Sequence, residues 1–365
     1  MSKNSIDSEQ LSELKIQGYK SIALCEIKLQ RINILIGANG AGKSNFIGFF
    51  KLIKAILDEK LQRTVGEMGG PDMLLHFGRK KTGSMSAELF FGNNGYRFTL
   101  KPTQDNRMMF DNECLWWNVR GDWKPSSGHF ETYAHTQKDA TKIYDFVIPA
   151  MRSWRVYHFH DTSTTATVKQ IHNINENEYL WHDARNLAAF LFRLKKQNEN
   201  SYKRITKAIQ LVAPFFDDFY LRPSVNNAEF IQLEWKEKNQ DTIFNASALS
   251  DGTLRFICLA AVLLQPEEFM PSTIIIDEPE LGLHPYAISV LASLIKVAAT
   301  QHQIIVSTQS VELINEFDPE DLIVVDKDEH NSVLRRLDSK ELEFWLEEYS
   351  LGDIWKKNLI GGRPS

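Results

Sequence analysis

The stretch that decides the fold is residues 31–50, which read RINILIGANGAGKSNFIGFF. The apolar run at 32–36 is rich in β-branched residues and predicts a buried strand. Residues 37–44 fit the pattern G-x-x-x-x-G-K-[ST], and an apolar helix is expected from Ser44 to about Leu57. Glycines let such a loop wrap an anion so that its N–H groups point at phosphate oxygens, and the helix N-terminus adds the positive end of its dipole. The stretch therefore predicts a phosphate-binding loop between a strand and a helix.

The residues of this loop have predicted roles in binding a nucleotide. Lys43 is expected to reach the β- and γ-phosphates, and the Ser44 hydroxyl is expected to ligate Mg²⁺. A chance glycine turn is the alternative, but strand, loop and helix follow one another in the order that the motif requires. The expected nucleotide-binding residues of this stretch are Gly37, Asn39, Gly40, Gly42, Lys43, Ser44 and Asn45.

Length and composition describe a folded globular protein. The chain has 365 residues, of which 43% are hydrophobic and 24% charged, so it can form one large or two ordinary domains. A net charge of −5 gives the surface as a whole no general attraction for nucleic acid, although a local basic patch is compatible with it. The three cysteines, Cys25, Cys114 and Cys258, are scattered, suit a reducing compartment and form no metal-site motif.

The sequence favours a cytoplasmic location without contact with a membrane. No apolar run reaches the ~18 residues that a membrane-spanning helix needs. The N-terminal residues 1–10 are polar and unlike a secretory signal.

The order of local patterns predicts an α/β fold in three parts. Residues 1–100 are interpreted as an N-terminal lobe with the phosphate-binding loop, residues 101–245 as inserted strands and a helical lobe, and residues 246–365 as a C-terminal lobe with a docking tail. Apolar strands separated by helices in the last part imply a parallel sheet that is covered on both faces.

Local patterns define further elements within these parts. Asn94-Gly95 is a strong signal for the turn of a β-hairpin. Asp183 is expected to cap the N-terminus of a helix over residues 184–196. Other expected elements are an edge strand at 14–16, a glycine-rich loop at 66–81, strands at 88–92, 96–101 and 108–119 with a break at 111–112, and a helix at 201–212.

Three minor features have competing interpretations. His158, His160 and Asp161 form an H-x-H-D string at a strand end, but metal ligation is the less favoured interpretation because no further ligands are suitably spaced. Trp116-Trp117 is favoured as a core or partner-facing pair over a base-stacking platform. Five basic residues of the helical lobe are favoured as a solvated face over a contact with a partner or with phosphate backbone: Lys195, Lys196, Lys203, Arg204 and Lys207.

Two carboxylates on a later strand extend the predicted nucleotide site. The strand expected at 273–276 ends in Asp277-Glu278. Asp277 can hold Mg²⁺ directly or through water, and Glu278 can orient and activate the attacking water. Adjacent carboxylates at a strand end have little structural use, which favours this chemical interpretation.

A helix start lies 27 residues upstream of Asp277, measured from Ser250. Residues 248–253 read ALSDGT, and the Gly252 N–H together with the helix dipole can hold a phosphate. Ser250, Asp251 and Gly252 are therefore further nucleotide-binding candidates. Ser-Asp-Gly is also common turn chemistry, so the assignment rests on its position before the carboxylates.

Together these motifs resemble the ABC-type ATPase superfamily, and within it the RecF/SMC/OLD-like branch rather than transporters. The resemblance covers roughly residues 12–100 and 245–330, and residues 280–285 resemble the D-loop region of that branch. It implies an ABC-type P-loop ATPase head with a mixed or parallel sheet, an antiparallel β subdomain and an inserted helical lobe. Residues 249–253 resemble the ABC signature L-S-G-G-Q, with Asp251 and Thr253 as departures. The resemblance also implies ATP and Mg²⁺ as cofactors, and a head-to-tail dimer in which the signature of one subunit contacts the nucleotide of the other. No heptad run is present, which excludes a long coiled-coil arm.

One departure from the family pattern lies in the switch region, residues 306–310. Gln309 stands where many ABC-type ATPases carry histidine. Glutamine can donate a hydrogen bond to the γ-phosphate but cannot become cationic near neutral pH. Slow or partner-dependent turnover is therefore our hypothesis. The candidate catalytic residues are Lys43, Glu278 and Gln309.

The last part of the chain resembles stand-alone ATPases of prokaryotic defence operons. The similarity rests on Gln309-Ser310, on LGDIW at 351–355 and on GGRP at 361–364. It implies an ATP-dependent homodimer or higher oligomer that regulates a separate effector, with a nuclease as the expected kind, in anti-phage defence. OLD nucleases carry a nuclease domain after the ATPase. Here no set of metal-binding carboxylates follows the last predicted sheet strand, so a nuclease is expected to be another chain.

Three other functions remain as alternatives. A DNA-repair or recombination ATPase of the RecF/SMC type would act directly on nucleic acid, and DNA-stimulated turnover without a partner would indicate it. A small-molecule kinase is disfavoured by the signature and by the paired carboxylates. A transporter subunit is disfavoured by the long insertion at 101–245.

Overall fold

The computed structural model describes residues 10–119, 121–138 and 141–363. The polar N-terminal stretch that is unlike a secretory signal lies, except for Gln10, outside the described residues. No helix within these described ranges is long and apolar enough to cross a membrane. The chain divides into two compact units: residues 1–156, 271–275 and 302–365 form the first, and residues 157–270 and 276–301 form the second. The division into three parts at residues 100 and 245 follows motifs instead and stays a prediction.

The first unit contains a six-stranded antiparallel sheet with the order β2-β1-β4-β5-β6-β7. Its strands are β1 (Glu13–Tyr19), β2 (Ile22–Lys28), β4 (Met85–Phe91), β5 (Asn94–Pro102), β6 (Met108–Trp117) and β7 (Gly121–Ser126). The prediction of an edge strand at 14–16 is wrong, because β1 pairs with β2 on one side and with β4 on the other. The short alternating run predicts a strand, but it does not show that a second strand, β4, pairs with β1.

The predicted Asn94-Gly95 turn is also wrong. Asn94 pairs with Phe91 and Gly95 pairs with Phe90, so both belong to β5 and the turn lies at residues 92–93. A side chain on Gly95 would collide with the ring of Trp116, which shows that this glycine makes room for packing rather than for a turn. The expected break at 111–112 is a β-bulge within a continuous strand, because the register shifts between Thr99 and Leu100 of the partner strand.

A second six-stranded sheet has the order β17-β16-β3-β15-β14-β8. Its strands are β3 (Ile32–Ile36), β8 (Arg155–Tyr157), β14 (Thr273–Asp277), β15 (Gln303–Thr308), β16 (Leu322–Asp328) and β17 (Asn331–Arg336). The predicted β3 is parallel to β15 and to β16, whereas β17 runs antiparallel to β16. The sheet is therefore mixed, as the ABC-type resemblance implies.

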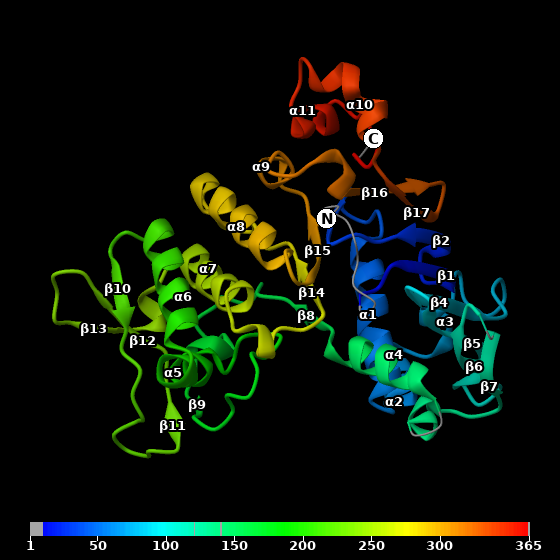
Figure 1. Cartoon of the computed structure of the whole chain (residues 1–365), viewed down its shortest axis with the longest axis horizontal. Coiled ribbons are helices and arrows are strands. Elements are labelled where there is room, and N and C mark those ends of the chain that lie inside the picture. Colours follow the sequence, from blue (N-terminus) through cyan, green and yellow to red (C-terminus); the bar gives the residue numbers. More distant parts are fainter. Residues whose placement is uncertain (1–9, 120, 139–140, 364–365) are drawn as a thin grey trace. The chain divides into compact units, whose positions relative to one another are not determined.

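Helices of the first unit share a core with the antiparallel sheet (Figure 1). Phe46, Phe49 and Phe50 point inward from the helix after the phosphate-binding loop, and Phe50 packs edge-on against Trp154 with ring centroids 5.1 Å apart. The predicted loop at 66–81 is wrong in part, because short helices occupy both sides of Gly69-Gly70. The helices of the first unit are α1 (Lys43–Leu57), α2 (Leu61–Glu67), α3 (Pro71–Leu74), α4 (Lys142–Ser153), α9 (Val311–Ile314), α10 (Ser339–Leu346) and α11 (Leu351–Lys356).

The second unit combines helices with two small sheets (Figure 1). Its helices are α5 (Leu187–Gln197), α6 (Glu199–Val212), α7 (Asp251–Leu263) and α8 (Pro285–Ala298). Its strands are β9 (His172–Asn173), β10 (Phe216–Phe219), β11 (Phe230–Ile231), β12 (Glu234–Glu237) and β13 (Ile243–Asn245). Asp183 is not the N-cap of α5, because that helix starts after Asn186 and Asp183 instead accepts hydrogen bonds from Arg185.

The predicted basic face of the second unit is partly neutralised. Lys195 lies 2.8 Å from a carboxylate oxygen of Asp218, and Lys203 lies 2.7 Å from Glu199 one helical turn away. Both pairs are exposed, as expected for a solvated face with weak ion pairs.

Candidate nucleotide site

The phosphate-binding loop, residues 37–44, leaves β3 and enters α1. Its lysine is directed back over the loop: the Lys43 side chain is 5% exposed, and Nζ donates hydrogen bonds to the carbonyl oxygens of Gly37 (2.5 Å) and Ala38 (3.0 Å). Ser44 is exposed in the first turn of the helix, where the backbone N–H groups lack partners within the helix. The lysine and the first turn of the helix therefore lie at the same loop.

Two glycines of the loop have positive φ angles, and at one of them, Gly42, a close neighbour also leaves no room for a side chain. Gly42 has φ +119°, and a Cβ atom there would collide with the hydroxyl of Ser332 on β17. Gly40 has φ +79°, but a Cβ atom there would meet nothing within 4 Å, so this turn of the loop is open. The loop is therefore closed on the side of β17 and open at Gly40.

A chain of hydroxyl groups holds the closed side of the loop. Ser332 Oγ donates to the Ala41 carbonyl oxygen at 2.6 Å and lies 2.7 Å from Ser21 Oγ. Asn45 Nδ2 donates to the same Ser21 oxygen at 2.7 Å, so this predicted nucleotide-binding residue supports the loop from behind. Sequence reasoning missed Ser21 and Ser332, because neither lies in a motif and only the folded sheets bring them to the loop.

Gln309 follows a strand that ends at the same sheet edge as the strand before the loop. Ile36 of β3 pairs with Thr308 of β15 in parallel register, so Gly37 and Gln309 are the next residues on two neighbouring strands. Ser310 then caps α9 by accepting a hydrogen bond from the Leu313 N–H at 3.1 Å. The carboxyl ends of parallel strands are where α/β proteins bind ligands.

The predicted carboxylates belong to the second unit. Asp277 is the last residue of β14, and its side chain is 16% exposed. Glu278 follows with φ +45°, a backbone conformation that is rare for a side chain of this kind and often marks functional sites. Both carboxylates therefore lie at a strand end, as the sequence predicts.

Two histidines accompany Asp277. His158 Nδ1 lies 3.6 Å from Asp277 Oδ2, and His160 Nε2 lies 3.2 Å from the Asp277 carbonyl oxygen. Their rings are 3.8 Å apart, and burial followed by the charge of His158 lowers the pKa of His160. No group of three or more His, Cys, Asp or Glu residues in the described part of the chain is arranged to hold a metal ion, and metal ligation by the H-x-H-D string stays a less favoured prediction. The strand end at His158 was visible in the sequence, but its neighbour Asp277 was not.

The signature-like residues open α7 as expected. Ser250 is the N-cap and accepts a hydrogen bond from the Thr253 N–H at 3.2 Å, while Ser250 and Asp251 are both exposed. A Cβ atom on Gly252 would collide with the carbonyl oxygen of Gly282, so this glycine lets the D-loop region approach the helix.

Arg255 lies one turn further along α7 and is 4% exposed. Its guanidinium donates to the carbonyl oxygens of Phe159 (2.8 Å), His160 (3.3 Å) and Leu281. Burial lowers its pKa, and the side chain satisfies backbone groups of two segments at once. The histidine segment, the signature helix and the D-loop region of the second unit are thus joined by one cation.

Comparison with known proteins identifies the family. A family model described as "AAA domain, putative AbiEii toxin, Type IV TA system" matches residues 32–315. The chain belongs to this family.

The other comparisons find a relative of similar sequence and solved structures of similar fold. The Old nuclease of Escherichia phage P2 is 26% identical over 203 residues, which are 50% of this chain and 33% of that protein. The chain therefore matches about a third of that curated relative. A crystal structure of an SMC head bound to the C-terminal winged-helix domain of ScpA has a TM-score of 0.61 at 16% identity and covers 92% of this chain and 99% of the other. An SMC head with an extended coiled coil, bound to the C-terminal domain of ScpA from Pyrococcus furiosus, has a TM-score of 0.56 at 14% identity and covers 93% and 98%. The likenesses to SMC heads confirm the predicted fold, that of an ABC-type ATPase head.

The residues present in this AAA domain fit a nucleotide with a divalent cation. Gly40 and Gly42 adopt left-handed φ angles, Lys43 lies over the loop, and the Ser44 hydroxyl is exposed at the helix N-terminus. The structure places Lys43, Ser44 and Gln309 in the first unit, and Ser250, Asp277 and Glu278 in the second. ATP, Mg²⁺ and the role of each residue are treated below as proposals.

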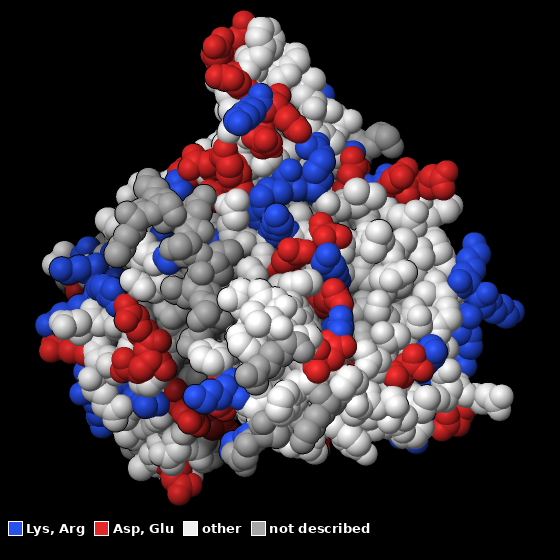
Figure 2. All heavy atoms as spheres, turned by 45° about the vertical axis from the view of Figure 1, so that its right-hand side comes forward, with Lys and Arg blue, Asp and Glu red and all other residues white. Residues whose placement is uncertain are grey.

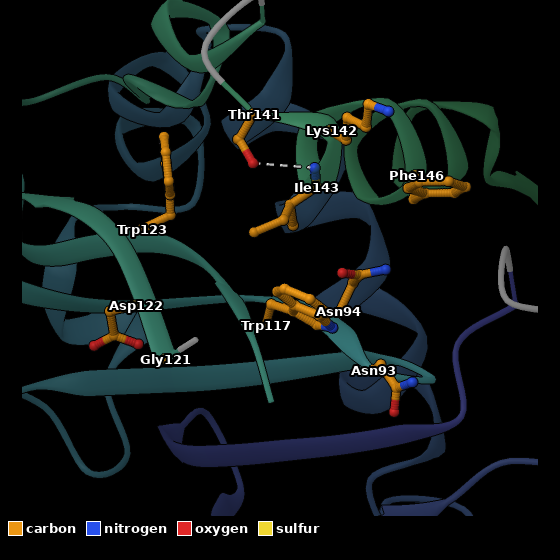
Figure 3. Close-up of a pocket in the computed structure, with 10 residues that line it drawn as sticks. All are labelled: Asn93, Asn94, Trp117, Gly121, Asp122, Trp123, Thr141, Lys142, Ile143 and Phe146. Atoms are coloured by element: carbon orange, nitrogen blue, oxygen red, sulfur yellow. Dashed lines mark hydrogen bonds between the residues drawn. The ribbon is translucent and has the colours of Figure 1, made fainter. Parts of the chain in front are cut away.

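The AAA domain also has a hollow of about 870 Å³ at the end of its antiparallel sheet. Figure 3 shows Ile143 of α4 directed into the space beside Trp117 of β6 and Trp123 of β7. Trp116, by contrast, packs edge-on against Phe90 with ring centroids 5.0 Å apart. One tryptophan of the predicted pair is thus packed and the other lines a hollow, while base stacking stays a prediction.

Proposed function

We propose that this protein is an ATPase of the cytoplasm that binds ATP with Mg²⁺ and hydrolyses it to ADP and phosphate. The observation that carries the proposal is the Lys43 side chain, which lies over the loop at the sheet edge where Gln309 also begins. The anion-binding loop thus holds a fixed cation, the Lys43 ammonium, and has an open turn at Gly40. A side-chain amide donor, Gln309, follows the neighbouring strand.

Each proposed role follows from the chemistry of a side chain. Lys43 and the loop N–H groups stabilise charge on the β- and γ-phosphates, and Gln309 donates a hydrogen bond to the γ-phosphate. Ser44 and Asp277 hold Mg²⁺, which supplies positive charge to the phosphates when bound. Glu278 orients the attacking water and accepts its proton.

The proposed output is an ATP-dependent homodimer. Ser250 and Asp251 are exposed at the start of α7, a 13-residue helix whose N-terminus favours anions. If they contact the nucleotide held by the partner's loop, ATP binds only between assembled subunits. A ligand that binds the assembled state stabilises it by mass action.

The proposed biological role is regulation of a separate effector, with a nuclease as the expected kind, in anti-phage defence. The family description names a toxin, and the phage P2 relative is named a nuclease. Figure 2 shows acidic side chains over the C-terminal helices, where Phe344 of α10 is 71% exposed beside Glu343 and Glu347. Aromatic residues are enriched at protein interfaces, so Phe344 is our candidate for a contact with the effector.

Phosphate release by purified protein, in wild type and in two lysine variants, tests the ATPase proposal. Lys43→Ala should lose tight ATP binding and turnover. Lys51→Ala removes an exposed lysine from the same helix and should change neither. Equal ATP affinity in folded Lys43→Ala and wild type would contradict the loop assignment.

Expression with and without the neighbouring gene product, followed by purification and phage challenge, tests the regulatory role. A stable complex that protects cells only when both proteins are present supports it. Full protection by this chain alone, or degradation of nucleic acid by it, would contradict the regulatory role. DNA-stimulated turnover without a partner would instead favour a RecF/SMC-type ATPase acting on DNA. A salt-dependent contact through Lys195, Lys196 and Lys203 would point the same way.

A further inference from the structure

A glycine pair near the end of the described chain lies against the phosphate-binding loop. Gly361 and Gly362 have φ +77° and +75°, which only glycine adopts readily. A Cβ atom on Gly362 would lie 2.9 Å from Val324 Cγ1 and 3.5 Å from the Cα atom of Gly37, the first residue of the loop. A side chain at Gly362 would therefore press on Val324 and come into van der Waals contact with the first residue of the loop.

The other end of the same segment packs on the helix that follows Gln309. The Gly352 N–H donates to Asn315 Oδ1 at 2.7 Å, and a Cβ atom on Gly352 would collide with Val311 Cγ1. Val311 is the first residue of α9, two positions after Gln309. The glycine in α11 thus lets the segment approach the switch region as closely as Gly362 approaches the loop.

The segment between these two contacts is itself well held. Ile354 and Ile360 are 0% and 3% exposed, and the Ile360 carbonyl oxygen accepts a hydrogen bond from Arg335 at 3.2 Å. The Trp355 indole nitrogen lies 3.5 Å from the position of a Cβ atom on Gly362. Residues 356–359 between them are exposed, so the buried residues at 351–355 and at 360–362 are the ones that can transmit displacement.

We propose that residues 351–362, here called the coupling segment, link the phosphate-binding loop to the switch region. Gly362 is a positioning residue for the loop, and Gly352 is a positioning residue for α9 and through it for Gln309. This inference rests on the proposed function, because it assigns the segment to the ATPase cycle. It predicts that damage at one end alters nucleotide binding, whereas damage at the other alters turnover.

Gly362→Ala tests the loop end against a matched control, Gly92→Ala. Both glycines have positive φ, so both variants carry backbone strain, but nothing lies within 4 Å of a Cβ atom at Gly92. Hydrogen exchange of residues 37–42 should be faster in Gly362→Ala than in Gly92→Ala. The ATP Kd and KM should rise about tenfold or more in Gly362→Ala and stay within about twofold in the control.

Gly352→Ala tests the switch end against Gly66→Ala. Both glycines are helical, and a Cβ atom at Gly66 meets nothing within 4 Å. Gly352→Ala should lower kcat about tenfold with little change in KM, while Gly66→Ala should keep both. This separation of KM from kcat is what a merely structural role would not produce.

The outcomes separate the inference from the proposed function. Equal hydrogen exchange in the loop of Gly362→Ala and Gly92→Ala overturns the inference, and this measurement needs no nucleotide. The wild type could bind no ATP while hydrogen exchange in the loop is still faster in Gly362→Ala than in Gly92→Ala. That result would support the contact and overturn the ATPase proposal instead. Equal changes of KM and kcat in both glycine variants would contradict the two-ended coupling.

Discussion

The buried guanidinium of Arg255 donates a 2.8 Å hydrogen bond to the carbonyl oxygen of Phe159, although the two residues lie far apart in the sequence. The same side chain reaches the carbonyl of Leu281 after the predicted catalytic carboxylates. Exposed arginines usually pair with carboxylates, whereas the guanidinium of Arg255 donates hydrogen bonds to backbone carbonyl oxygens. It therefore fixes the path of two segments on either side of α7.

Arg255→Ala should destabilise the second unit and lower turnover. The substitution leaves the buried Phe159 carbonyl without this donor, at a cost of about 1–3 kcal/mol, and the partly buried carbonyls of His160 and Leu281 lose the same donor at a smaller cost. Arg255→Lys keeps the charge but cannot reach all three carbonyls, so it should be intermediate. Thermal unfolding and kcat would be measured beside Arg222→Ala, which removes an exposed arginine and should leave both near wild type. A fully active, fully stable Arg255→Ala would show that the three contacts are dispensable.

Glu278→Gln should bind ATP but fail to hydrolyse it. Glutamine keeps the size of the side chain and loses the carboxylate that accepts a proton from water. We expect kcat to fall about 100-fold or more, within the range for loss of a general base, with Kd within a few fold of wild type. Single-turnover phosphate release and size-exclusion chromatography with ATP would show loss of hydrolysis and an accumulated dimer. Normal turnover would assign the water to another group.

Mixing two inactive variants tests catalysis across the dimer. Lys43→Ala damages the loop, and Ser250→Arg places a bulky cation at the exposed start of α7. In a mixed dimer both lesions can fall on one nucleotide site, which leaves the other site intact, so part of the activity should return. Lys43→Ala mixed with itself is the control and should stay inactive. Demonstrated mixed dimers without any recovery would count against shared sites.

The three cysteines should resist alkylation in the folded protein. All are buried, and burial raises the pKa of Cys25 and of Cys258 to about 12 and that of Cys114 to about 11, from an ordinary value of 9.0. Because only the thiolate reacts, maleimide labelling at pH 8 should be slow in native protein and complete in denaturant. Fast native labelling of any of the three would show that its segment opens.

The same thiols make folding stability depend on pH. The unfolded thiols lose protons near pH 9, whereas the folded ones keep them to about pH 11 or 12. The unfolded state therefore binds fewer protons between these values, and stability falls as pH rises through that window.

Sequence patterns predicted the elements whose own residues form a strong local motif. They missed the features that depend on contacts with residues far away in the sequence. The loop at residues 37–44, the helix to Leu57 and the strand before Asp277 each follow from local residues. Gly95 carries a turn signal, but Trp116 from another strand occupies the space above it. Asn186 rather than Asp183 begins α5, because Asn186 also binds the Trp181 N–H and two carbonyls of the preceding segment.

The candidate site shows the same limit. Ser332 and Ser21 support the loop, yet each is an ordinary serine in a turn or strand until the two sheets form. His158 meets Asp277 only after β14 is in place. Their roles depend on contacts between remote parts of the chain, which no local window of sequence contains.

The pairing of Ile36 with Thr308 has a consequence for how the protein is made. The strand before the loop is translated well before the strand that pairs with it. At about 5–20 residues per second, the ribosome needs roughly 15–55 s to cover the distance between the two residues. During that time the nascent chain holds an apolar strand without its partner, exposed to chaperones and to aggregation. Slower translation between these two strands lengthens that exposure and should lower the yield of folded protein.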